Sequence, residues 1–311
     1  MEKPKVGIVI LNWNGFNDSR RCVESFRGLR YPNHELVIAD NGSTDGSCEA
    51  LRQEFPGLTL VETGRNLGYT GGNNVGIKRA LADGSGYVLI VNNDTESINP
   101  DFVGELVREM ESQPGLGVIG PKVLNPGNVV QHTILLAPTL SNSIRESVLY
   151  KTGRKEPEDY DRAQAVNAVS GVCWMIRREV FEKVGLLDED YLSYVEEQDY
   201  CYRAQKAGWK IMYYPVESVV HYKEADDKNK ERGYRQYVYA RRNLVLFLRK
   251  HSGLRKAFFL AVLFLSSNSL KVVYSSLKRG RNDFYSRRLL LDLVSQFKTV
   301  LAKEGTCGRK T

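Results

Sequence analysis

The sequence predicts an α/β fold in which a mostly parallel central sheet is covered by helices on both faces. Strand and helix signals alternate at short intervals over about the first 125 residues, and parallel strands need such crossover helices between them. The clearest strand, residues 87–91, is a run of β-branched and apolar side chains, which is typical of a buried strand. Polar clusters follow four of these strands, as they do at the ligand-binding edge of an open α/β sheet.

The order of the elements follows from start and stop signals along the chain. Helices are expected after capping residues such as Asn17 to Ser19, and they are expected to end at breakers such as Pro56 and Gly57. Strands are predicted at residues 6–11, 35–39, 58–62, 87–91 and 118–123, and helices at residues 17–29, 43–55, 73–82 and 100–111.

The middle of the chain is less regular. Residues 126–165 combine turn signals, mixed polarity and a charged stretch, which predicts loops and short hairpins that cover a site. Regular elements then return as a strand at 166–175, helices at 178–184 and 198–207, and a strand at 210–214. From Tyr234 the pattern is helical to the end of the chain.

Composition bounds the class of protein. The 311 residues are 42% apolar and 26% charged, as in folded globular proteins. The five cysteines are scattered without C-x-x-C spacing, so neither a zinc site nor a redox pair is expected, which fits a reducing compartment. The first residues do not have the pattern of a signal peptide.

Charge divides the chain into two regions. Residues 228–311 contain 20 Lys and Arg against 4 Asp and Glu, a balance of +16, whereas residues 1–227 carry −9. We therefore expect an α/β domain followed by a basic helical region. The basic region contains an apolar run, 257–265, which is too short to span a bilayer and is flanked by cations such as Arg255 and Lys256. This pattern predicts a helix at a membrane surface; the alternative is an ordinary buried helix with a cationic face.

The four polar strand ends outline one cleft if they share an edge of the sheet. Asp94, after the fourth strand, is well placed to hold a divalent cation, although Asn and Asp also favour simple turns. Gly71 and Gly72, expected just before a helix, offer backbone N–H groups to a phosphate or a sugar hydroxyl. The clusters are residues 11–15, 40–45, 65–74 and 92–94.

Motifs of other nucleotide-binding proteins are absent from the sequence. It contains no G-x-x-x-x-G-K-[ST], which excludes a P-loop. It contains no G-x-G-x-x-G after the first strand, which argues against a dinucleotide fold. Sugar nucleotidyltransferases share a related sheet, but their first loop, rich in glycine and lysine, is missing after Leu11.

Three carboxylates, Glu196, Glu197 and Asp199, crowd the start of a predicted helix. They would stabilise the helix dipole by about 0.3–1 kcal/mol each, which is the structural interpretation. In the functional interpretation they supply a general base, because crowded like charges raise at least one pKa toward the working range. His221, at the end of a strand-like run, is either a ligand for a cation or phosphate or a structural histidine.

Taken in order, these motifs resemble the family 2 glycosyltransferases, inverting enzymes of the GT-A fold, and in particular their rhamnosyltransferase-like branch. The resemblance covers about residues 3 to 250. Several spaced motifs in order are more specific than any one of them. The matching pieces are residues 6–15, 39–47, 66–74, 91–95, 170–171 and 194–203, and His221.

The resemblance implies a role for each matching position. Asp94 would hold Mg²⁺ or Mn²⁺ against the donor diphosphate, with His221 near the metal or the phosphates. Glu197 falls on the last acidic position of the family's Glu-Asp pair and would be the catalytic base. Nucleotide contacts are expected at Leu11, Asn12, Asn14, Asp40, Asn41, Asn66, Gly71, Gly72, Asn73 and Asn93, and contacts to the acceptor or donor sugar at Gly171, Trp174, Glu196 and Asp199.

Two positions depart from the family pattern. The metal motif is often Asp-x-Asp, but Asn92 stands at its first position, so Asp94 is the only carboxylate there. The usual base is an aspartate, and Glu197 is one methylene longer. Glu196 and Asp199 therefore stay open as rivals for the role of base.

The resemblance implies an enzyme that moves a sugar from a UDP- or dTDP-sugar, with dTDP-rhamnose as a candidate, to a saccharide or lipid-linked saccharide. Its place would be cell-surface polysaccharide or glycan assembly, at the cytoplasmic (inner) face of the cell membrane. A membrane surface is thus an expected partner, nucleic acid is not, and the oligomeric state stays open. The alternative is a non-catalytic nucleotide-binding scaffold that partners an active transferase.

Overall fold

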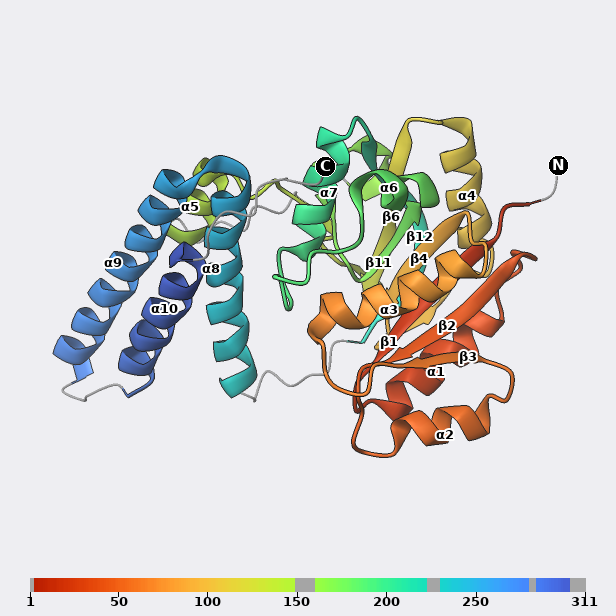
Figure 1. Ribbon diagram of the computed structural model, residues 1–311, viewed down its shortest axis with the longest axis horizontal. Coiled ribbons are helices and arrows are strands. Elements are labelled where there is room, and N and C mark those ends of the chain that lie inside the picture. Colours follow the sequence, from red (N-terminus) through yellow and green to blue (C-terminus); the bar gives the residue numbers. More distant parts are fainter. Residues whose placement is uncertain (1–2, 149–159, 223–229, 280–283, 303–311) are drawn as a thin grey trace. The chain divides into compact units, whose positions relative to one another are not determined.

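The computed structural model describes residues 3–148, 160–222, 230–279 and 284–302 (Figure 1). Contacts within the chain separate it into two compact units. The first comprises Met1–Leu136, Arg154–Leu192 and Glu196–Ala225, and the second comprises Ala137–Gly153, Ser193–Val195 and Asp226–Thr311.

The first unit is built on a mixed sheet with the strand order β3-β2-β1-β4-β11-β6-β12-β5. The four strands at one side are parallel to one another, as predicted, and β11 then runs antiparallel to both of its neighbours. Beyond β11, strands β6 and β12 are again parallel, and the short β5 is antiparallel to β12. The bounds are β1 (Val6–Asn12), β2 (His34–Asp40), β3 (Thr59–Glu62), β4 (Tyr87–Asn92), β5 (Thr95–Ser97), β6 (Leu116–Asn125), β11 (Cys173–Arg177) and β12 (Lys210–His221).

Helices cover both faces of this sheet, which confirms the predicted layers. Side chains of β1 alternate between the two faces, because successive residues of a strand point to opposite sides. Ile8 and Ile10 belong to the same core as side chains of α1 and α4, whereas Val9 packs in a second core with α3, α6 and α7. The helices are α1 (Phe16–Arg27), α2 (Ser47–Glu54), α3 (Gly68–Ala82), α4 (Phe102–Ser112), α6 (Arg178–Val184) and α7 (Glu196–Lys206).

One helix boundary corrects the prediction in a way that matters for the site. Helix α3 begins at Gly68 and not at Asn73, so Gly71 and Gly72 lie within its first turns and are buried. A Cβ on Gly71 would lie 2.7 Å from Leu67 Cβ, and one on Gly72 would lie 2.4 Å from Leu11 Cδ1. These glycines therefore permit close packing of the helix and do not form an open phosphate-binding loop ahead of it.

The irregular middle segment also differs from expectation. Short strands are present at β7 (Val129–Val130), β8 (Ile134–Leu135) and β9 (Gln164–Ala165), but a helix, α5 (Leu140–Val148), was missed. The strand predicted at 166–175 is split into β10 (Ala168–Val169) and β11 by a turn. Most of the charged stretch at 151–162 lies outside the described residues.

The second unit is helical, as predicted for the C-terminal region. It contains α5, α8 (Lys230–Ser252), α9 (Leu254–Arg279) and α10 (Phe284–Ala302), and α8, α9 and α10 contact one another (Figure 1). Its core includes Phe264 and Phe297, whose rings stack with centroids 6.1 Å apart. Among the described helices, none has a stretch that is both long and apolar enough to cross a membrane.

Candidate active site

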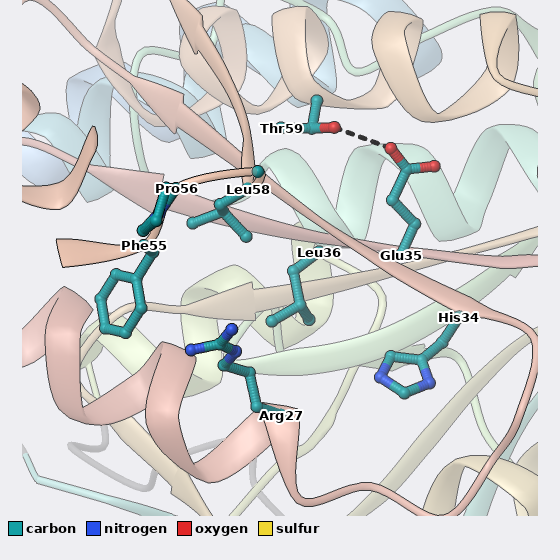
Figure 2. Close-up of a pocket in the computed structure, with 9 residues that line it drawn as sticks. Arg27, His34, Glu35, Leu36, Phe55, Pro56, Leu58 and Thr59 are labelled. Atoms are coloured by element: carbon teal, nitrogen blue, oxygen red, sulfur yellow. Dashed lines mark hydrogen bonds between the residues drawn. The ribbon is translucent and has the colours of Figure 1, made fainter. Parts of the chain in front are cut away.

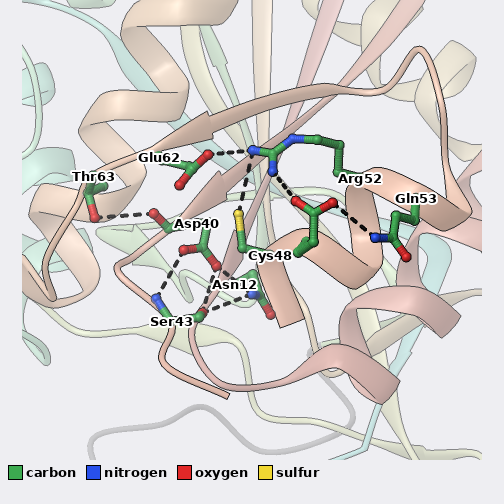
Figure 3. Close-up of polar contacts among 9 residues, drawn as sticks. Asn12, Asp40, Ser43, Cys48, Arg52, Gln53, Glu62 and Thr63 are labelled. Atoms are coloured by element: carbon green, nitrogen blue, oxygen red, sulfur yellow. Dashed lines mark hydrogen bonds and ion pairs between the residues drawn. The ribbon is translucent and has the colours of Figure 1, made fainter. Parts of the chain in front are cut away.

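Strand register brings the predicted polar clusters together at the carboxyl ends of β1, β2 and β4. Asn12 at the end of β1 lies beside Asp40 at the end of β2, and Leu11 lies beside Asn92 at the end of β4. The Asn12 amide donates hydrogen bonds to Asp40 Oδ1 at 2.7 Å and to Ser43 Oγ at 3.1 Å (Figure 3). Parallel pairing therefore places the first, second and fourth clusters at one edge of the sheet.

Asp40 is held by hydrogen bonds that keep its carboxylate in one orientation. Besides the Asn12 amide, Oδ1 accepts a bond from the Ser43 hydroxyl at 2.6 Å, and Oδ2 accepts one from the Ser43 backbone N–H at 3.0 Å (Figure 3). Asp40 is 2% exposed. These contacts fix the shape of the nucleotide site predicted here, and the binding role of Asp40 stays a prediction.

The third cluster is organised by Asn41. Its amide donates to Gly68 O at 3.0 Å, and its side-chain oxygen accepts the Leu67 N–H at 2.9 Å. Asn41 thus ties the end of β2 to the first turn of α3. The remaining predicted nucleotide contacts have internal partners as well: Asn14 accepts Thr44 N–H, Asn66 accepts Gly68 N–H, Asn73 donates to Tyr69 O, and Asn93 donates to Ser19 Oγ.

Asp94 and His221, the two predicted metal ligands, are in direct contact. His221 Nε2 lies 3.1 Å from Asp94 Oδ1, and both side chains are mostly buried. The other ring nitrogen, Nδ1, lies 2.9 Å from Gln131 Oε1. An Nδ1–H that donates to this oxygen leaves the lone pair of Nε2 free to bind a cation, which is the usual arrangement around a ligating histidine.

The pair fits a divalent cation. Neighbouring ligands of an octahedral Mg²⁺ lie about 3 Å apart, given bonds of about 2.1 Å, and the Asp94 and His221 ligand atoms are 3.1 Å apart. In the described part of the chain no group of three or more His, Cys, Asp or Glu side chains is arranged to hold a metal ion. Asp94 and His221 would leave the other positions around an octahedral divalent cation to substrate phosphates and water.

The three carboxylates at the start of α7 have different surroundings. Asp199 has a fully buried side chain and pairs with Arg203 at 2.7 Å, which favours a structural role. Glu196 is 6% exposed, and its Oε2 accepts no hydrogen bond from the described residues. Burial, and then the charge of Glu197, raise the pKa of Glu196 well above its ordinary value. The negative charge of one carboxylate thus favours the protonated form of its neighbour.

Tyr69 is a site residue that the sequence reasoning missed. Its hydroxyl donates a 2.8 Å hydrogen bond to Gly171 O. Its pKa is raised well above the ordinary value, first by burial and then by the charges of Glu196, Glu197 and Asp94. The phenol therefore lies within electrostatic reach of both the candidate base and the candidate metal ligand. Its position inside the 66–74 motif was the only available signal.

The sugar contacts predicted at Gly171 and Trp174 lie beside Tyr69. A Cβ on Gly171 would come within 2.8 Å of the Tyr69 hydroxyl, so a side chain there would displace the ring. Trp174 is fully buried and packs edge-on against Tyr200, with ring centroids 5.7 Å apart. Trp174 is therefore part of the packed interior, and its contact with a sugar stays a prediction.

A separate hollow of about 320 Å³ lies elsewhere (Figure 2). It is lined by His34, Glu35 and Leu36 at the amino end of β2, together with Thr59 at the amino end of β3. Thr59 donates a 2.7 Å hydrogen bond to Glu35. Because ligands in open α/β sheets bind at the carboxyl ends of the strands, this hollow is not the site described above.

Comparison with known proteins agrees with the fold. A chain from Mycobacterium tuberculosis, the N-acetylglucosaminyl-diphospho-decaprenol L-rhamnosyltransferase, is 30% identical over 268 residues, which are 79% of this chain and 85% of that protein. The low-salt glycan biosynthesis hexosyltransferase Agl10 of Haloferax volcanii is 28% identical over 236 residues, 75% of this chain and 72% of that protein.

Solved structures share the fold at lower identity. The mannosyltransferase PcManGT from Pyrobaculum calidifontis, solved in complex with GDP-Man and Mn²⁺, has a TM-score of 0.57 at 15% identity, over 98% of this chain and 89% of that one. S. aureus TarS 1-349, solved in complex with UDP-GlcNAc, has a TM-score of 0.56 at 14% identity, over 96% and 81%. These likenesses support the GT-A fold.

The comparison with sequence families gives the most specific result. The model described as Glycosyl transferase family 2 matches residues 7–185, more than half of the chain. The matched segment contains β1 to β4, Asp94, Tyr69 and Gly171. The chain therefore belongs to glycosyl transferase family 2.

Proposed function

We propose that this chain transfers a sugar from a nucleoside-diphosphate sugar to an acceptor hydroxyl with inversion at the anomeric carbon. The observation that carries the proposal is the contact between Asp94, which follows the carboxyl end of β4, and His221, whose Nε2 lies 3.1 Å from Asp94 Oδ1. Burial, and then the charges of Glu196, Glu197 and Asp94, raise the pKa of the Tyr69 phenol, which supports a site that contains both a candidate base and a candidate cation ligand. Inverting transfer needs both groups in one site.

Glu197 is proposed to be the general base. In a single in-line displacement, the acceptor oxygen bonds to the anomeric carbon while the bond to the diphosphate breaks, and the base takes the acceptor proton. Burial and the charge of Glu197 raise the pKa of Glu196, which makes Glu196 the weaker candidate for an ionised base. Asp199 is neutralised by Arg203, 2.7 Å away, and does not compete.

Asp94 and His221 are proposed to hold Mg²⁺ or Mn²⁺. When bound, the cation would supply charge neutralisation for the departing diphosphate. The 3.1 Å separation of the two ligand atoms and the hydrogen bond between His221 and Gln131 support this assignment. PcManGT, which has the same fold, was solved with Mn²⁺.

Donor and acceptor are proposed from the relatives. The mycobacterial relative is named for a rhamnosyl transfer to a decaprenol-linked diphosphate sugar, and Agl10 is named for glycan biosynthesis. We propose a dTDP- or UDP-sugar donor and a saccharide or lipid-linked saccharide acceptor of cell-surface glycan assembly.

Helix α9 is proposed to lie against the cytoplasmic face of the cell membrane. Phe258, Phe259 and Val262 are 57%, 53% and 43% exposed on this helix, directly after Arg255 and Lys256. Aromatic side chains beside cations suit an anionic interface, where apolar burial and charge attraction add. Sedimentation with anionic vesicles tests this: wild type should bind, and the double substitution Phe258→Ser with Phe259→Ser should not.

The catalytic proposal is tested by donor turnover. The full-length chain with Mn²⁺ is screened against dTDP-rhamnose, UDP-GlcNAc and GDP-mannose, and release of the nucleoside diphosphate is measured. Glu197→Gln should lower kcat by about 10²–10⁴-fold while nucleotide binding is retained. Full turnover in this variant would overturn the assignment of the base, and nucleotide binding without turnover in wild type would favour a non-catalytic scaffold.

A further inference from the structure

The backbone directly before the two adjacent glutamates is unusual. Tyr194 and Val195 have φ of 70° and 73°, the left-handed region that non-glycine residues rarely adopt. Val195 is β-branched, which makes this conformation still less favourable. Glu196 and Glu197 follow immediately as the first residues of α7. Such a conformation persists only where surrounding contacts impose it.

One side chain of α8 contacts two carbonyl groups of the strained segment. The Asn243 amide donates two hydrogen bonds, to Ser193 O and to Tyr194 O, each 2.8 Å long. Asn243 is fully buried, and its side-chain oxygen accepts a 2.6 Å hydrogen bond from Arg242. Because Arg242 occupies the oxygen, the amide NH₂ is directed at the two carbonyls.

The preceding end of the segment is held as well. Leu192 O accepts the Tyr69 N–H at 2.8 Å, and Tyr191 O accepts the Thr70 hydroxyl at 2.5 Å. Residues 191–194 are therefore hydrogen-bonded through four successive carbonyl groups. The hydrogen bonds to Ser193 O and Tyr194 O both come from Asn243.

We infer that Asn243 is a positioning residue for catalysis, which holds residues 193–195 in the left-handed conformation that presents Glu196 and Glu197. The inference rests on the proposed role of Glu197 as base. Loss of the two hydrogen bonds removes the restraint on Tyr194 and Val195, and the segment relaxes toward ordinary φ values. The first turn of α7, which carries both glutamates, is then displaced from the reacting hydroxyl.

Asn268 provides a matched control in the same unit. It is also buried, donates a 2.7 Å hydrogen bond to Phe264 O, and accepts one from Tyr237 at 3.1 Å. Its contacts lie within α8 and α9 and include no residue of 193–195. Asn268→Ala therefore removes a buried amide of equal size without touching the segment before α7.

The experiment compares kcat and KM for donor turnover in the full-length chain with Mn²⁺, using the donor selected by the screen above. Asn243→Ala should lower kcat by about 10- to 100-fold, the effect of misplacing a reacting group by about 1 Å. Its KM for the donor should stay within about twofold of wild type, since the nucleotide site is built on β1 to β4. Asn243→Asp keeps the shape and can pair with Arg242, but lacks the NH₂ donor, and should behave like the alanine variant.

A rescue experiment distinguishes the loss of positioning in Asn243→Ala from a general loss of structure. Glycine adopts positive φ without penalty, so Val195→Gly in the Asn243→Ala background should recover about tenfold of the lost kcat. Hydrogen exchange at residues 193–197 should be faster in Asn243→Ala than in wild type and unchanged in Asn268→Ala. Equal kcat in the Asn243 and Asn268 variants would overturn the inference. Retained turnover in Glu197→Gln would instead overturn the proposed base, so the two failures are distinguishable.

Discussion

His221 Nε2 lies 3.1 Å from Asp94 Oδ1, although the two residues are far apart in the sequence. Strand pairing creates this contact: His221 is opposite Thr95 in the antiparallel pair of β12 and β5, and the Tyr222 N–H donates to Asp94 O at 2.8 Å. The position of the proposed cation is therefore set by backbone hydrogen bonds that fix both ligands before any cation arrives.

His221→Ala should weaken the activation of donor turnover by Mn²⁺. Removal of the imidazole leaves Asp94 as the only protein ligand and frees Gln131, so the Mn²⁺ concentration for half-maximal activity should rise by about tenfold or more. The measurement is turnover against Mn²⁺ concentration, with Mn²⁺ binding followed by electron paramagnetic resonance. His34→Gln is the control, because His34 lies at the amino end of β2 and contacts Tyr31 O. Unchanged Mn²⁺ binding in the His221 variant would contradict the assignment.

Glu196→Gln should change how stability depends on pH. The pKa of Glu196 is raised by burial and by Glu197, so the folded state keeps a proton that the unfolded chain releases above about pH 4.3. Stability from this group is complete below that pH and is lost as the pH rises toward the raised pKa. Glutamine is neutral at every pH. The Tm of the variant relative to wild type should therefore rise with pH, by about 2–4 °C for each kcal/mol of unfolding free energy that the wild type loses.

The matched control for this prediction is Glu182→Gln. Glu182 is a largely exposed residue of α6, so its substitution should leave the difference in Tm between pH 5 and pH 8 unchanged. Scanning calorimetry at both pH values is the measurement. If the Tm of Glu196→Gln differs from that of wild type by the same amount at pH 5 and at pH 8, Glu196 is ionised in the folded state.

Asp199→Ala should destabilise the fold strongly. The Asp199 carboxylate is fully buried against Arg203, which also donates to Val184 O and Leu186 O at 3.0 Å. Removal of one partner leaves a mostly buried guanidinium without its counter-charge, at a cost of about 3–5 kcal/mol. Urea unfolding measures the effect.

The control is the exposed ion pair of Arg79 and Asp83, which has the same four-residue spacing as the buried pair of Asp199 and Arg203. Arg79 and Asp83 are four residues apart on the chain and 2.6 Å apart in space, with Arg79 nearly half exposed. Asp83→Ala should leave the urea midpoint close to that of wild type, because exposed pairs contribute little. Equal urea midpoints for Asp199→Ala and Asp83→Ala would show that the buried pair of Asp199 and Arg203 contributes no more stability than the exposed pair.

Short-range patterns predicted much of the first unit. Alternating apolar runs located β1 to β4, and their order placed four polar clusters at one edge, because parallel strands share an end. The family motifs then gave Asp94, Glu197 and His221 as predicted site residues. What the sequence left open was which of Glu196, Glu197 and Asp199 is free to act, since that depends on the pairing of Asp199 with Arg203.

Features that depend on packing were missed. Glycine is a poor helix former, so Gly68 to Gly72 were not predicted as the start of α3, although packing against Leu67 and Leu11 favours glycine there. Tyr69 was overlooked because a partly buried phenol inside a polar cluster has no local signature. The left-handed φ of Val195 opposes the preference of its residue type, and the neighbouring carbonyl groups accept hydrogen bonds from Asn243, which is distant in the sequence.

Gly72→Ala should weaken nucleotide binding, whereas Gly76→Ala should not. Both glycines are buried in α3. An added Cβ would lie 2.4 Å from Leu11 Cδ1 at Gly72 and 2.4 Å from Val9 Cγ1 at Gly76. Both changes should cost about 1–3 kcal/mol through overpacking, but only the first pushes on Leu11, a predicted nucleotide contact.

The measurement is titration calorimetry in the presence of Mn²⁺. The titrant is the nucleoside diphosphate, among UDP, dTDP and GDP, that raises the Tm of the wild type most. Gly72→Ala should raise Kd by about tenfold, which is 1.4 kcal/mol of binding free energy, and Gly76→Ala should leave Kd within about twofold. The Cβ at Gly72 would also lie 3.0 Å from Asn41 Cγ, so the change disturbs the link between β2 and α3. An equal loss of affinity in both variants would place the nucleotide away from Leu11 and would attribute the effect to α3 as a whole.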